Sequence, residues 1–153
     1  MRVAFVRHGE RRKGEADPEL TSFGVRMVSE TGAWLRQQQF IPTIVQTTNT
    51  KRTQQTTDLL IHDLSNITQE TIEDAPELQR DWERWWETLD RGKEDADILL
   101  VGHHPTMEML LQCYGPAPCS FSKRNFAVAL ILQTNADGGY TITHAWPGRT
   151  SLA

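Results

Sequence analysis

The chain has 153 residues, of which 38% are hydrophobic and 24% charged, and its formal net charge is −4. This length suits one domain with a substantial core, and we expect a single domain over residues 1–153. No apolar run approaches the ~20 residues of a membrane span, so a membrane is not an expected partner. The negative charge argues against nucleic acid as a partner, because such binding needs a basic face.

The cysteines and the N-terminus are typical of a cytoplasmic protein. Cys113 and Cys119 do not form a metal-ligand cluster, and we expect both to be free thiols. The N-terminus leads directly into strand-like sequence, without the basic and apolar regions of a secretion signal. We therefore expect a cytoplasmic protein that uses no metal ion or other cofactor.

The first half of the chain alternates predicted strands and helices. The short apolar run Val3–Val6 predicts a buried strand. Thr21 and Asn49 are predicted to cap two helices, each with apolar residues at helical spacing. In chain order we expect a strand over 3–6, a helix over about 21–38, a strand over 43–47, a helix after residue 49 and a short strand over 68–72.

The second half of the chain continues the alternation and ends in a hairpin. The continuous apolar run over 97–102 predicts a parallel strand covered on both faces, and Pro105 is expected at the first position of the next helix. A turn over 135–139 predicts a hairpin between strands over 126–132 and 140–146. This pattern predicts an α/β fold, a three-layer α/β/α sandwich with a mixed, mostly parallel sheet.

A helix is also expected over about 78–91. Its tryptophans Trp82, Trp85 and Trp86 share one face, because they are three and four residues apart. Aromatic side chains dominate core burial, so packing is the favoured role for this face. Docking of a partner is the alternative.

Polar side chains follow four of the predicted strands, and the carboxyl ends of parallel strands meet at one edge of a sheet. Histidine beside a fixed positive charge suits chemistry on a phosphoryl group: imidazole is nucleophilic at neutral pH, and guanidinium holds phosphate oxygens bidentately. Nearby helix N-termini add N–H donors for an anion. The residues expected to converge are Arg7 and His8, Thr48 and Arg52, Glu77, and His103.

Four motifs in this order resemble those of the histidine phosphatase superfamily, which has a phosphoglycerate mutase-like fold. The resemblance implies that His8 is a nucleophile that becomes phosphorylated. It also implies that Arg7, Arg52 and His103 bind the phosphoryl group and stabilise charge on its oxygens without a metal ion. The motifs are Arg7-His8-Gly9-Glu10, Leu20-Thr21 with Gly24, Arg52-Thr53-Gln54-Gln55-Thr56 and Gly102-His103-His104-Pro105.

The chain departs from the family pattern at two places. The family has Ser-Pro where this chain has Thr48-Asn49; Thr48 keeps a hydroxyl, and we expect it among the phosphate-binding groups. Many relatives use an acidic residue to protonate the leaving group. Glu77 lies in about the right region for this role, although another alignment places Arg80 there.

Within the family the chain is most similar to the short SixA-type phosphohistidine phosphatases. Only about 50 residues separate Arg52 from His103, which leaves little chain for a lid. The expected function is therefore hydrolysis of phosphohistidine on a protein, so the partner is a phosphorylated protein. The alternatives are a phosphatase for small phosphorylated molecules and a non-catalytic module that binds a phosphorylated ligand.

Other polar residues have more ordinary interpretations. We expect His104 to be a helix-cap or rim residue, and His62 and His144 to lie on the surface. The run 11–13, Arg-Arg-Lys, is either a solvated loop or a recruitment site for an acidic partner. Gly24 is expected to let its helix approach neighbouring backbone closely.

Overall fold

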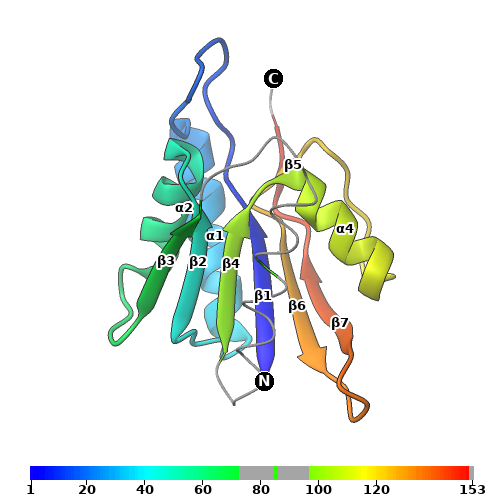
Figure 1. Ribbon diagram of the computed structural model, residues 1–153. Helices are drawn as coiled ribbons and strands as arrows, with labels where there is room; N and C mark the ends of the chain where they lie inside the picture. Colours follow the sequence, from blue (N-terminus) through cyan, green and yellow to red (C-terminus); the bar gives the residue numbers. More distant parts are fainter. Residues whose placement is uncertain (73–84, 86–96, 152–153) are drawn as a thin grey trace.

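A central sheet with helices on both faces organises the molecule (Figure 1). The structure is a computed structural model that describes residues 1–72, residue 85 and residues 97–151. The expected helix over 78–91 lies outside this part of the chain, apart from Trp85. The described elements are β1 (Arg2–Arg7), α1 (Ser22–Gln37), β2 (Ile44–Thr48), α2 (Lys51–Ile61), β3 (Thr68–Ile72), β4 (Ile98–Gly102), α4 (His104–Tyr114), β5 (Asn125–Phe126), β6 (Ala129–Thr134), β7 (Tyr140–Trp146) and β8 (Arg149–Thr150).

Within the described residues, six strands form one mixed sheet in the order β3-β2-β4-β1-β6-β7. The strands β3, β2, β4 and β1 run parallel to one another, whereas β6 is antiparallel to both β1 and β7. The turn over 135–139 joins β6 to β7, closed by a hydrogen bond from the Asn135 N–H to the Gly139 carbonyl (2.7 Å). The predicted mixed, mostly parallel sheet is confirmed.

The two faces of β1 contribute side chains to two hydrophobic cores. Val3 and Phe5 pack with side chains of α4 such as Met107. Ala4 and Val6 belong to the core on the opposite face, which α1 and α2 cover. This alternation follows from the period of two along a strand, and it produces the three layers that the sequence predicted.

Three local predictions were wrong by small amounts. Thr50 caps α2 in place of Asn49: its side chain accepts the Thr53 N–H. The helix α4 begins at His104, so Pro105 is its second residue. The expected strand over 126–132 is two strands, β5 and β6, because Ala127 adopts a positive φ of 54° between them.

Two glycines allow close packing around the ends of β1 and β4. A Cβ at Gly24 would collide with the carbonyl of Glu10, so the predicted close approach of α1 is confirmed. A Cβ at Gly102 would collide with the indole of Trp85. Trp85 is 1% exposed, and its ring centroid lies 5.2 Å from that of Phe5, so it packs in the core as predicted.

The longest described helix is α1, with 16 residues. Among the helices of the described residues, none is both long enough and apolar enough to span a membrane.

Candidate active site

The ends of three adjacent parallel strands bring the predicted polar residues to one edge of the sheet. Arg7 and Thr48 are the last residues of β1 and β2, and His103 directly follows β4. The register pairs Arg7 with Gly102 across β1 and β4. His8 continues from β1, and its N–H donates to the Gly102 carbonyl (3.0 Å). The carboxyl ends of β1, β2 and β4 therefore lie side by side, and they bring Arg7, His8, Thr48 and His103 to the same edge of the sheet, as the sequence predicted.

His8 is buried, and its ring orientation is fixed. It is 4% exposed, and its Nδ1 lies 2.8 Å from the carbonyl oxygen of Gly9. A carbonyl oxygen can only accept, so Nδ1 carries the proton in this hydrogen bond. In the neutral ring Nε2 then has the lone pair. This tautomer leaves Nε2 able to act as a nucleophile.

The surroundings of His8 keep its imidazole neutral. Burial is the main cause that lowers its pKa well below 6.5, partly opposed by the Gly9 hydrogen bond. Positive charge on His103, Arg7 and Arg52 lowers the pKa further. A neutral imidazole close to cations is the form that can attack an electrophilic phosphorus.

This arrangement predicts the titration of His8. Long-range ¹H–¹⁵N spectra should show the Nδ1–H tautomer and a midpoint below pH 6.5. Because the unfolded chain binds this proton more readily than the folded chain, the stability contributed by neutral His8 should decline as pH falls from 6.5 towards the lowered pKa. A His8 midpoint at or above 6.5 would contradict the assignment.

Arg7 is held from two sides at the same edge. One guanidinium nitrogen donates to the carbonyl oxygens of Lys123 and Asn125, at 2.6 Å each. The guanidinium also lies 4.1 Å from the ring centroid of Phe126, a cation–π contact. Burial, followed by the charge of Arg11, lowers the Arg7 pKa to about 10, so the side chain stays charged at neutral pH.

One donor of Arg7 has no partner within the described protein. Its Nε is buried and has no hydrogen-bond partner among the described residues. A buried unsatisfied N–H is costly, so such groups are expected where a ligand completes the hydrogen bonding. Because the atom is covered by protein, an anion would reach it only after the surrounding side chains shift.

Arg52 approaches the same edge from the first turn of α2. Its side chain is 17% exposed and lies 4.0 Å from the carboxylate of Asp17. The N–H of Lys51 donates to the same carboxylate (3.0 Å), and the N–H of Gly9 donates to Thr56 (3.2 Å). These contacts connect α2 with the loop that follows His8 and fix where Arg52 lies.

His103 lies beside His8 and is held by a buried threonine. The two imidazole rings meet edge to face, with centroids 5.5 Å apart. His103 Nε2 lies 2.9 Å from the hydroxyl of Thr48, which is fully buried. The Thr48 hydroxyl also contacts the Thr53 hydroxyl (2.7 Å), which in turn contacts that of Thr50 (2.6 Å). A chain of hydroxyl groups therefore orients His103.

This placement changes the expected role of Thr48. The sequence predicted a phosphate ligand, but the hydroxyl lies between Thr53 and the ring of His103. The roles of Thr53 and Thr50 were not predicted; the available signal was the hydroxyl-bearing residues that recur at 48, 50 and 53 around the start of a helix. We therefore expect Thr48 to act through His103.

A pair of variants separates the hydroxyl from the shape of Thr48. Thr48→Val should lower kcat/KM about tenfold, because a hydrogen bond to a buried polar group contributes about 1–2 kcal/mol. Thr48→Ser keeps the hydroxyl and should stay close to the parent enzyme. Steady-state kinetics with p-nitrophenyl phosphate, together with circular dichroism, provides the measurement. Equal activity of the two variants would show that the hydrogen bond has no part in catalysis.

The remaining predicted residues lie away from this edge or outside the described chain. Glu77 falls outside the described residues. His104 is in the first turn of α4 and contacts Glu108 (2.9 Å). His62 and His144 are exposed, as predicted, and both cysteines are free. Within residues 1–72, 85 and 97–151, no group of three or more His, Cys, Asp or Glu side chains could hold a metal ion.

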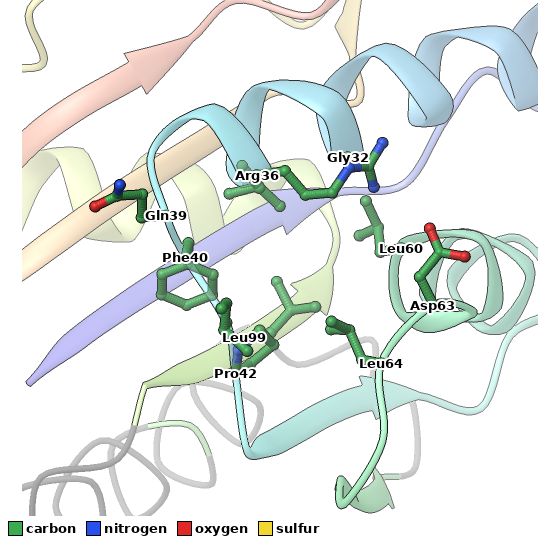
Figure 2. Close-up of a pocket in the computed structure, with 11 residues that line it drawn as sticks. Gly32, Arg36, Gln39, Phe40, Pro42, Leu60, Asp63, Leu64 and Leu99 are labelled. Carbon is green, nitrogen blue, oxygen red and sulfur yellow. The ribbon is translucent and has the colours of Figure 1, made fainter.

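A separate, mainly apolar cavity of about 370 Å³ has no histidine in its lining (Figure 2). It is situated between the C-terminal parts of α1 and α2, and its walls include Leu35, Phe40, Leu60 and Leu64. Pro42, which precedes β2, also lines it. The cavity therefore lies towards the amino ends of the parallel strands and is distinct from the candidate site.

Comparison with known proteins links the first half of the chain to one class of protein. Residues 3–74 match the model of the histidine phosphatase superfamily, branch 1. The matched segment, a little under half of the chain, resembles this superfamily of hydrolases, whose members act on phosphorylated molecules. None of the curated proteins compared with the chain matches it in sequence.

Solved structures share the fold over nearly the whole chain. The protein histidine phosphatase SixA complexed with tungstate is 20% identical, with a TM-score of 0.73 and coverage of 96% of this chain and 97% of that chain. A SixA protein from Agrobacterium tumefaciens is 19% identical, with a TM-score of 0.74 and coverage of 95% and 96%. A phosphoserine phosphatase from Entamoeba histolytica is 12% identical, with a TM-score of 0.66 and coverage of 98% of both chains. At these identities the likeness establishes the phosphoglycerate mutase-like fold.

Proposed function

We propose that this phosphatase hydrolyses phosphohistidine on another protein through a phosphohistidine intermediate on His8. The observation that carries the proposal is the state of His8: a buried, neutral imidazole whose Nδ1–H is taken by Gly9. Its Nε2 is then available beside His103 and two arginines. This combination supports nucleophilic attack on a phosphoryl group.

The proposed reaction has two steps. The Nε2 lone pair of His8 forms a bond to phosphorus, and the bond between phosphorus and the substrate imidazole nitrogen breaks. The departing nitrogen takes up a proton. Water then attacks phospho-His8 and releases inorganic phosphate, which regenerates the imidazole. Arg7, Arg52 and His103 would stabilise the charge on the non-bridging oxygens in both steps.

The proposed substrate class rests on leaving-group chemistry and on fold relatives. Imidazole is a better leaving group than an alkoxide, so a phosphoramidate needs less help from an acid. A short connection between Arg52 and His103 suits a phosphate displayed on a protein surface. Among the proteins that share the fold is the protein histidine phosphatase SixA.

Glu77 remains the proposed proton donor for phosphoester substrates. A positioned general acid contributes about 10²–10⁴-fold when an alkoxide must leave. Glu77→Gln should therefore lower turnover of a sugar phosphate by a factor in this range and spare turnover of phosphohistidine. Steady-state rates on both substrates provide the measurement. Equal effects on the two substrates would indicate a structural role for Glu77.

A substrate panel tests the proposed function. The panel compares a histidine-phosphorylated protein with p-nitrophenyl phosphate and sugar phosphates, using phosphate release as the readout. We expect the highest kcat/KM for the phosphohistidine protein. A sugar phosphate as the best substrate would favour a small-phosphoester phosphatase, a function consistent with the shared fold of the phosphoserine phosphatase. Phosphate binding without any turnover would favour a non-catalytic module.

A further inference from the structure

The loop that follows β1 is an ordered arm above the catalytic edge of the sheet (Figure 1). It folds back on itself: the N–H of Arg12 donates to the Glu19 carbonyl (2.9 Å), and the N–H of Thr21 donates to the Glu10 carbonyl (2.9 Å). Arg11 and Leu20 form an antiparallel bridge between these two contacts. The arm therefore presents residues 11–13 in a defined position.

One side of this arm borders a small cavity that is rich in positive charge. The cavity has a volume of about 140 Å³, and Arg11, Arg12 and Lys13 all line it. Phe126 also lines it, and the ring of Phe126 contacts Arg7 (4.1 Å) and His8 (centroids 5.8 Å apart). Phe126 therefore belongs both to the wall of this cavity and to the immediate surroundings of Arg7 and His8. We call this cavity the cationic groove.

Besides the three basic residues, one acidic residue, Glu10, lines the groove, so its lining keeps an excess of positive charge. The carboxylate of Glu10 contacts the hydroxyls of Thr21 and Ser151, each at 2.8 Å. Asp17 is directed to α2, where it contacts the N–H of Lys51. Arg12 has a weak pair with Glu19 at 4.0 Å, with both side chains about half exposed. Exposed pairs of this kind contribute little, so the arginine charge stays available.

We propose that the cationic groove docks an acidic stretch of the protein substrate next to its phosphorylated histidine. This inference rests on the proposed function and adds the kind of surface that the substrate must display. Three consecutive cations suit several carboxylates along an extended segment, and 140 Å³ suits a side chain rather than a whole small ligand. The protein has a net charge of −4, which disfavours binding of an acidic substrate segment elsewhere on its surface. The groove would therefore determine how the substrate is positioned.

Two matched peptides and two matched double variants test this inference. Both peptides carry one phosphohistidine made with phosphoramidate; one has four flanking glutamates and the other has four glutamines. The test variant is Arg12→Gln with Lys13→Gln, which keeps the charge of Arg11 that acts on Arg7. The control variant is Arg26→Gln with Arg36→Gln, two exposed cations on α1, so both proteins lose the same charge.

The parent enzyme and the control variant should prefer the glutamate peptide about tenfold in kcat/KM, the size expected of two exposed ion pairs. The test variant should lose this preference and keep the parent kcat/KM for p-nitrophenyl phosphate. Salt at 0.5 M should reduce the preference in the parent enzyme, because exposed charges are screened. An equal preference in the test and control variants, or no preference in the parent, would overturn the inference.

A binding measurement separates this inference from the proposed function. Fluorescence anisotropy with the unphosphorylated glutamate peptide reports docking without any turnover. If the protein binds this peptide through Arg12 and Lys13 but hydrolyses neither phosphopeptide, the proposed function fails and the groove still docks acidic segments. If both phosphopeptides are hydrolysed equally well and the unphosphorylated peptide does not bind, the groove has no docking role and the proposed function stands.

Discussion

Replacing His8 by alanine should lower kcat by about 10³-fold or more, as the loss of a nucleophile does in enzymes with covalent intermediates. The imidazole lies beside His103, and its Nε2 is left available by the Nδ1–H hydrogen bond to Gly9. Arg7 and Arg52 remain in the variant, but they can only polarise a phosphoryl group. Phosphate release from p-nitrophenyl phosphate and from a phosphohistidine peptide provides the measurement.

The His8→Ala protein should still fold. Its backbone keeps the hydrogen bonds to Gly102 (3.0 Å) and Ala127 (3.1 Å), which do not involve the side chain. His62→Ala is the matched control, since His62 is an exposed histidine at the end of α2, and it should keep the parent activity. A folded His8→Ala protein with more than a few per cent of parent activity would contradict the assignment of the nucleophile.

The second large effect is expected at Arg7. Arg7→Lys keeps the charge but loses the planar guanidinium, one nitrogen of which donates to the carbonyls of Lys123 and Asn125. Removal of one preorganised donor to a developing charge costs about 10²–10³-fold in rate. We therefore expect kcat/KM to fall by a factor in this range, and inhibition by inorganic phosphate to weaken as well.

A neighbouring arginine provides the control for Arg7. Arg11→Lys makes the same chemical change at an exposed position on the arm and should leave kcat/KM for p-nitrophenyl phosphate within about twofold, as surface substitutions usually do. Circular dichroism and thermal melting exclude misfolding of Arg7→Lys as the cause. If Arg7→Lys and Arg11→Lys behave alike, the fork of Arg7 has no special role.

Hydrophobic patterns predicted most of the fold. The continuous apolar run over 97–102 became the central strand β4, and the periodic stretch after Thr21 became α1 with that residue as its cap. Both hydrophobic patterns arise from burial along one strand or helix, so each can be recognised within a single stretch of the sequence. The break between β5 and β6 was not predicted, because a positive φ at Ala127 depends on contacts elsewhere in the fold.

Only part of the candidate site could be predicted from the sequence. The ends of the parallel strands brought Arg7, His8 and His103 together because strand order and direction determine where those residues lie. The contacts that orient them were not predictable. Arg7 is held by the carbonyl of Lys123, 116 residues away, and backbone carbonyls carry no sequence signal. The hydroxyl of Thr48 contacts Thr53 and also His103, which is 55 residues away in the chain.

Rapid-quench trapping of the phosphoenzyme tests the central claim most directly. The parent enzyme is mixed with ³²P-labelled phosphohistidine peptide, quenched within milliseconds in base, and digested for mass spectrometry. The account predicts an acid-labile, base-stable phosphoryl group on the peptide that contains His8, formed before phosphate is released and absent from His8→Ala. A phosphoryl group on another residue, or full turnover with no phosphoenzyme at any time, would contradict it.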